Sequence, residues 1–329
     1  MLLVFIGFGA TSNLASKAME VDGFENLGFY QNAVIYLMFG LFSFLGTATV
    51  NKIGNKWTLV VGSMCYFFNV IVDLLPSQYG EQIENREKYL YLNKDFIYTM
   101  ILFCAAVNGM GAGIIWTAQG NYVSSCATDE NKGFFFSYFY FIYMTSQVLG
   151  NLIAAFVLNN SKQSTFYMIM GGITLLGCLT FLLLTKPKMQ QIQESIVNQQ
   201  MRKMIPMSIF TGVSISIYSG SFVQLISQSL NDIDHESWSQ NEKLALSLFA
   251  MVPLGIGELV GSVFMGPFID KFGSKIAIVP CFALLVISYM LLFIFTLETN
   301  FSILVYFLTF TWGLLDSCIN NLQSLCLFY

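Results

Sequence analysis

Long apolar stretches recur along the whole chain, and they constrain its fold more than any other feature of the sequence. A helix needs about twenty apolar residues to cross the hydrocarbon core of a bilayer. Ten stretches meet this criterion, namely residues 2–18, 28–50, 57–75, 96–119, 134–158, 165–185, 207–229, 244–268, 276–297 and 301–325. We therefore predict an all-α, multi-pass membrane protein with about ten helices.

The composition excludes several other classes of protein. Hydrophobic residues make up 55% of the chain and charged residues only 10%, whereas a soluble domain carries about 25% charged residues. The strands of a membrane barrel would alternate apolar and polar residues, but runs such as 134–157 are apolar on every face. A nucleic-acid-binding protein, a disulfide-stapled secreted domain, a soluble enzyme and a membrane β-barrel are therefore disfavoured.

Enzymatic and metal chemistry also lack the necessary residues. The chain has one histidine, His235, which falls in a predicted loop, and seven cysteines without metal-ligand or disulfide spacing. Neither a phosphate-binding P-loop nor a dinucleotide-binding motif is present. We expect no enzymatic activity, no metal, no cofactor and no ATP-driven transport.

The distribution of Lys and Arg predicts the orientation, because basic loops are retained in the cytoplasm. With the N-terminus inside, nine basic residues fall in cytoplasmic loops and six in outer loops, where we place Lys17. We expect no Lys or Arg within the membrane. Two candidate glycosylation sites, Asn159 and Asn300, fall in outer loops.

Two loops that lie six helices apart repeat the same pattern. The loop after the eighth span contains Gly266, Asp270, Lys271, Gly273 and Lys275, and the loop after the second span contains Asn51, Lys52, Gly54 and Lys56. The glycine permits a tight turn at the membrane surface. Two parallel six-helix halves, each with this loop, are the plan of a major facilitator transporter.

This plan divides the chain into three parts. We predict an N-terminal bundle over 1–185, a polar cytoplasmic linker over 186–206 and a C-terminal bundle over 207–329. Because the plan requires twelve helices, we expect that the last two are missing from an incomplete product; a genuine ten-helix variant is the alternative.

Five further segments carry a narrower resemblance. They are Asn26–Tyr30, Gly111–Tyr122, Thr145–Ile153, Leu254–Gly261 and Gly313–Asn320, and the block from Trp116 to Asn121 is the most specific. The chain resembles the uncoordinated-93 family. The resemblance implies a divergent major facilitator fold and a non-enzymatic accessory role, as a regulatory subunit or trafficking chaperone of an ion channel or membrane receptor. It places the protein in the plasma membrane or an endomembrane.

Two acids are expected within the membrane, Glu258 and Asp316, and such groups are functional candidates. Either could take up and release a proton, or each could join helices by hydrogen bonds worth roughly 0.6–2 kcal/mol. Further polar candidates near the bundle centre are Asn320, Gln119, Asn121, Gln147 and Asn151. The acids support an alternative function, secondary transport of a small solute.

Overall fold

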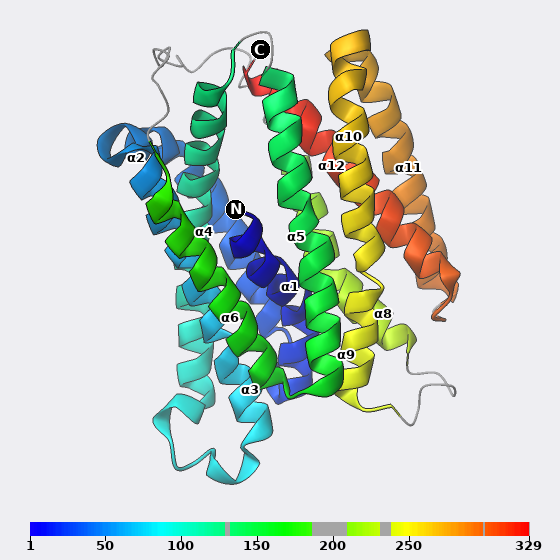
Figure 1. Ribbon diagram of the computed structural model, residues 1–329. Helices are drawn as coiled ribbons and strands as arrows, with labels where there is room; N and C mark the ends of the chain where they lie inside the picture. The colour runs from blue at the N-terminus through cyan, green and yellow to red at the C-terminus, as the bar shows by residue number, and fades with distance from the viewer. Residues whose placement is uncertain (129–131, 186–208, 231–237, 299, 329) are drawn as a thin grey trace.

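The computed structural model describes residues 1–128, 132–185, 209–230, 238–298 and 300–328, and for a few of these the backbone alone. Within these ranges the protein is helical and contains no strand (Figure 1). The predicted all-α class is confirmed. The predicted linker 186–206 and His235 lie outside the described residues.

Helices of different lengths cover the predicted spans. They are α1 (Leu2–Met19), α2 (Leu27–Val72), α3 (Leu74–Glu81), α4 (Lys94–Cys126), α5 (Lys132–Asn160), α6 (Gln163–Thr180), α8 (Val223–Ser229), α9 (Gln240–Phe249), α10 (Val252–Phe272), α11 (Ser274–Glu298) and α12 (Ile303–Phe328). Short 3-10 segments cover Ile83–Asn85, Leu90–Leu92 and Phe181–Leu183, and π-helical turns cover Glu20–Phe24 (η1) and Tyr218–Phe222 (η5). Nine helical stretches of the described residues are long and apolar enough to cross a membrane.

One of these stretches, Leu27–Glu81, contains two of the predicted spans. Its helix α2 is interrupted at Gly54, where φ is 80° and ψ is 161°. The chain reverses there, because Gln31 in the first limb donates a hydrogen bond of 2.7 Å to Asp73 after the second limb. The two predicted spans, 28–50 and 57–75, therefore form the two limbs of one helical hairpin.

The turn between α10 and α11 has the same backbone conformation. At Gly273 φ is 81° and ψ is 158°, within a few degrees of the values at Gly54. This region of φ and ψ is essentially restricted to glycine. Both turns lie at the end of the bundle that is uppermost in Figure 1, called here the Gly54 end, opposite the α3–α4 loop.

The stretch Gln240–Ile269 differs from the prediction of a single helix over 244–268. A break at Ala250 and Met251 separates α9 from α10, and Pro253 stands in the first turn of α10. Proline has no N–H to continue the preceding helix but fits the first turn of a new one.

Helix α1 lies at the centre of the bundle. Every residue from Gly9 to Met19 is buried, and the helix contacts α2, α5, α6 and η5. In contrast, α11 exposes a row of large apolar side chains that includes Phe282, Met290 and Phe293. Such a face is suited to lipid.

Candidate functional site

The candidate site begins where α10 and α12 come into close contact. A methyl group on Gly257 or Gly313 would collide with the facing backbone, at the carbonyl oxygens of Phe310 and Leu254 respectively. This approach brings Glu258 of α10 close enough to Asp316 of α12 for their charges to interact. Glu258 is 0% exposed and Asp316 is 3% exposed, so the predicted burial of both acids is confirmed.

The two carboxyls have few hydrogen-bond partners. Among the described residues, neither side-chain oxygen of Glu258 has a partner, and Oδ1 of Asp316 has none. Oδ2 of Asp316 accepts a hydrogen bond of 2.8 Å from the predicted site residue Asn320. A buried ionised carboxyl without partners costs several kcal/mol, so this pair requires a proton or a bound cation.

No positive side chain of the described residues acts on either carboxyl. The hydroxyls of Ser262, one turn after Glu258, and of Ser317, the residue after Asp316, lie 2.8 Å apart. These hydroxyls add polar groups to the interface but do not compensate a negative charge.

Two tyrosines lie within electrostatic range of the carboxyl pair, Tyr143 of α5 and Tyr218 of η5. Tyr143 packs against the same apolar cluster as Leu259, the residue that follows Glu258. The Tyr143 ring lies 4.9 Å from Phe5 and 5.2 Å from Trp116, measured between ring centroids. Phe5 of α1, Trp116 of α4 and Tyr143 of α5 thus form one aromatic cluster.

An amide cluster lies next to the carboxyls. Asn13 of α1 donates hydrogen bonds to Gln147 at 3.4 Å and to Asn151 at 3.2 Å, both on α5. The Gln147 side chain also borders Gly255 of α10, one turn before Glu258. Gln147 and Asn151 are predicted site residues, whereas Asn13 was not predicted; its place in the apolar first span was the available signal.

The other predicted polar residues are not joined to the pair. Gln119 is buried and Asn121 is half-buried on α4, and neither forms a hydrogen bond with Glu258 or Asp316.

The residues of the repeated loops lie at the Gly54 end. Gly266 packs against Ser137 of α5, Lys271 is exposed with its ammonium 5.3 Å from the Phe272 ring, and the Asp270 and Lys275 side chains lie outside the described atoms. Of the first copy, Asn51, Lys52 and Gly54 are exposed and Lys56 is half-buried.

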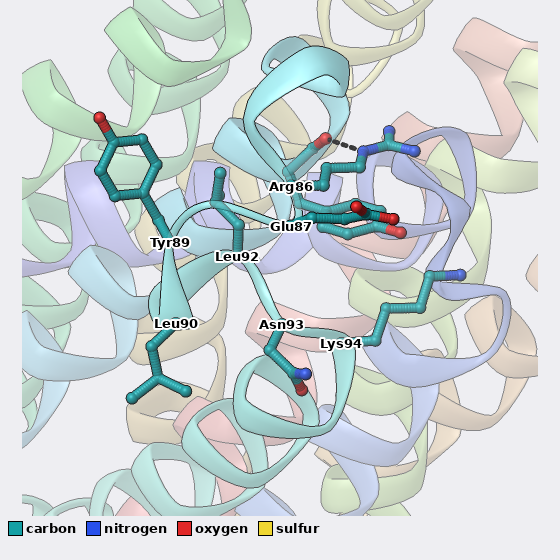
Figure 2. A pocket seen from close by; sticks show the side chains of 8 residues that line it. Arg86, Glu87, Tyr89, Leu90, Leu92, Asn93 and Lys94 are labelled. Atoms are coloured by element: carbon teal, nitrogen blue, oxygen red, sulfur yellow. Dashed lines mark hydrogen bonds between the residues drawn. The ribbon is translucent and has the colours of Figure 1, made fainter.

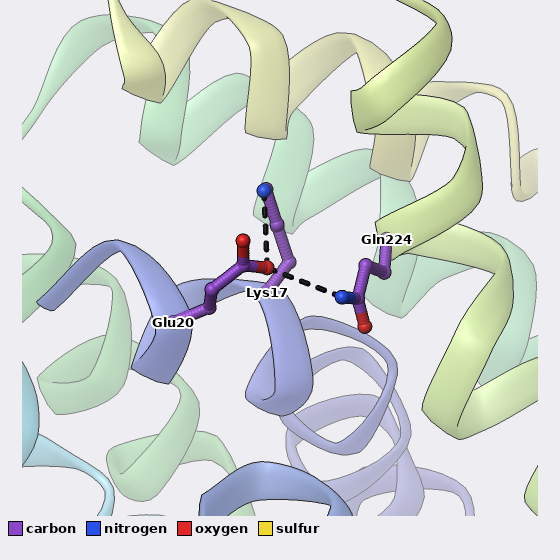
Figure 3. Close-up of polar contacts among 3 residues, drawn as sticks. All are labelled: Lys17, Glu20 and Gln224. Carbon is purple, nitrogen blue, oxygen red and sulfur yellow. Dashed lines mark hydrogen bonds and ion pairs between the residues drawn. The ribbon is translucent and has the colours of Figure 1, made fainter. Parts of the chain in front are cut away.

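At the opposite end, the prediction that Lys17 lies in a loop is wrong. Lys17 is within α1 and 9% exposed. Its ammonium lies 3.1 Å from the Glu20 carboxylate, which also accepts a hydrogen bond of 3.2 Å from Gln224 of α8 (Figure 3). Lys17 thus lies inside the predicted span 2–18, where Glu20, itself bonded to Gln224, pairs with its charge.

The prediction that Glu258 and Asp316 are the two intramembrane acids is also wrong. Asp73 is 1% exposed between α2 and α3 and is bonded to Gln31. Asp22 of η1 accepts a hydrogen bond of 2.9 Å from Gln163. Both differ from Glu258 in having a side-chain partner.

A pocket and the two candidate glycosylation sites lie on the surface. An open pocket near the α3–α4 loop is lined by Tyr79, Arg86, Glu87, Tyr89, Leu90, Leu92, Asn93 and Lys94 (Figure 2). The Arg86 guanidinium lies 3.9 Å above the Tyr79 ring, and its Nε donates to the Tyr79 carbonyl. Asn159 and Asn300 are exposed.

Comparison with solved structures shows the fold. The nucleoside transporter NupG aligns with 99% of this chain and 84% of its own, at a TM-score of 0.62 and 12% identity. A D-xylose-proton symporter aligns with 99% of this chain and 86% of its own, at a TM-score of 0.59 and 15% identity.

Curated relatives support the narrower resemblance. UNC93-like protein 3 of Arabidopsis thaliana is 29% identical over 174 residues, which are 50% of this chain and 32% of that protein. Protein unc-93 homolog A of Danio rerio is 24% identical over 173 residues, 49% of this chain and 32% of its own length. The chain thus spans about a third of the relatives that it matches. The Major Facilitator Superfamily model matches residues 33–327, and the chain belongs to this superfamily.

Proposed function

We propose that this protein is a secondary transporter of a small solute, in which the Glu258–Asp316 pair binds the coupling ion or the solute. The observation that carries the proposal is Glu258, a fully buried carboxyl whose two oxygens have no hydrogen-bond partner. A purely structural acid would be expected to have partners, as Asp73 does. An intramembrane acid without one is suited to binding and release.

Contacts between the two predicted halves suit alternating access. At the α3–α4 end Gln224 bonds to Glu20, and the Asn241 amide lies 3.5 Å from the Ser161 carbonyl oxygen. These contacts join the predicted units 1–185 and 207–329 at one end. In the proposed cycle they break when the bundle opens to that side, and the carboxyl pair exchanges its ligand there.

Uptake into proteoliposomes under an imposed proton gradient tests this function. A panel of sugars, nucleosides, amino acids and amines is offered to wild-type protein, to Glu258→Gln and to Asp73→Asn. We expect uptake of at least one solute that falls at least tenfold in Glu258→Gln and persists in Asp73→Asn. Equal uptake by wild type and Glu258→Gln would remove the role of the pair.

A second function is supported by the similarity to UNC93-like proteins. Following the resemblance described above, the protein would be a non-enzymatic accessory subunit or trafficking chaperone of a channel or receptor in the plasma membrane or an endomembrane. Capture of the tagged protein from native membranes in mild detergent tests this role. A channel or receptor recovered in near-equal amount supports it, and recovery of a monodisperse protein alone opposes it.

A further inference from the structure

The Glu258–Asp316 pair is negatively charged unless protonated. Lys17 is held by Glu20, and no Lys or Arg among the described residues acts on either acid. Glu258 is fully buried, its side-chain oxygens have no partner among the described residues, and its helix packs closely against the helix that carries Asp316. A cation from outside the protein can supply the missing charge.

The surroundings are unsuited to a divalent metal. The described residues contain no group of three or more His, Cys, Asp or Glu that could hold a metal ion. Instead, the half-buried Tyr143 ring packs against the same cluster as Leu259, next to Glu258, and lies 5.2 Å from the half-buried Trp116 ring, measured between centroids. Aromatic faces bind ammonium groups, and quaternary ammonium ions are their characteristic ligands.

We propose that the Glu258–Asp316 pair and the rings of Tyr143 and Trp116 form a binding site for a monovalent organic cation, a protonated amine or a quaternary ammonium ion. The ammonium group lies between the two carboxylates, and its alkyl groups contact the aromatic faces. This inference rests on the proposed transport function, for which it names the substrate class. Protons compete with the ligand, because a protonated carboxyl no longer attracts it.

Thermal unfolding of the protein in lipid nanodiscs tests the site with defined probes. The probes are choline, tetramethylammonium and tetraethylammonium, compared with sodium chloride at equal ionic strength. The matched control is 3,3-dimethylbutan-1-ol, a neutral molecule with the shape of choline. We expect at least one ammonium probe to raise the unfolding midpoint in a saturable manner, and the neutral alcohol to leave it unchanged at the same concentrations.

Variants separate the contributions of charge and ring. In Glu258→Gln/Asp316→Asn the saturable rise is lost, whereas Asp73→Asn, which alters a buried carboxyl elsewhere, retains it. Tyr143→Leu weakens the apparent affinity at least tenfold, and Tyr143→Phe keeps it within about threefold. Since the comparison of choline with its neutral analogue uses wild-type protein, the test does not depend on the folding of any variant.

Two results would overturn the inference. One is that none of the three ammonium probes shifts the midpoint of the wild type; the other is an equal shift in the double variant. If either result is found while proton-driven uptake still requires Glu258, the organic-cation site is refuted and the transport function stands. Loss of uptake dependence on Glu258 would refute the transport function itself.

Discussion

Gln224 donates a hydrogen bond of 3.2 Å to Glu20, which lies 204 residues earlier in the chain. The same carboxylate holds Lys17 at 3.1 Å. This bond connects α8 with the turn that follows α1 (Figure 3). In alternating access it would have to break whenever the α3–α4 end opens.

Replacing Gln224 by leucine is therefore expected to favour opening at that end. A hydrogen bond to a charged group contributes about 1.5–3 kcal/mol, and we expect about 1 kcal/mol here because the Glu20 side chain is 38% exposed. The measurement is disulfide cross-linking between cysteines placed at Ser161 and Asn241, quantified by mass spectrometry. Cross-linking should fall several-fold in Gln224→Leu; an unchanged yield would show that the bond does not hold this end closed.

Gly313 sets the distance between α10 and α12. A methyl group there would collide with the Leu254 carbonyl oxygen, and such overpacking typically costs about 1–3 kcal/mol. Gly313→Ala should lower the midpoint of thermal unfolding in detergent. Gly172→Ala is the control, since a methyl group at Gly172 meets no atom within 4 Å. Equal midpoints for the two variants would contradict the close packing of these helices.

The turn glycines are expected to resist substitution for a different reason. At Gly54 and Gly273 an added methyl group has open space, but φ is near +80° at both. An L-residue held in that conformation costs of order 1–3 kcal/mol. Gly54→Ala and Gly273→Ala should each lower the unfolding midpoint, whereas Gly40→Ala, in open space with helical backbone, should not. Tolerance of alanine at both turns would show that the turns do not require glycine.

Much of the fold could be predicted from the sequence because it depends on local composition. In lipid, a run of about twenty apolar residues can satisfy its backbone hydrogen bonds by forming a helix. The ten predicted spans correspond to the observed helices. The turn glycines could be found because a positive φ restricts the residue type. The break before Pro253 and the π-helical turn at Tyr218–Phe222 were not predicted, because periodicity alone does not report a local change of helical register.

The candidate site could be predicted in part. Glu258 and Asp316 stand out because they are acids in apolar helices. Lys17 and Asp73 already fall inside the predicted spans 2–18 and 57–75, so placing Lys17 in a loop and omitting Asp73 from the intramembrane acids was avoidable. Only their partners distant in sequence, Gln224 for the Lys17–Glu20 pair and Gln31 for Asp73, depend on tertiary packing. The rings beside the carboxyls come from different helices, so their convergence is a property of tertiary packing.

The role of the Glu258–Asp316 pair as the exchange site is the central claim, and a pH jump on protein adsorbed to a solid-supported membrane tests it most directly. Wild-type protein should show a charge displacement as protons bind to the two buried carboxyls, of which Asp316 is bonded to Asn320. In Glu258→Gln/Asp316→Asn the displacement should fall at least tenfold, and in Asp73→Asn it should persist. A full displacement in the folded, monodisperse double variant would contradict the claim.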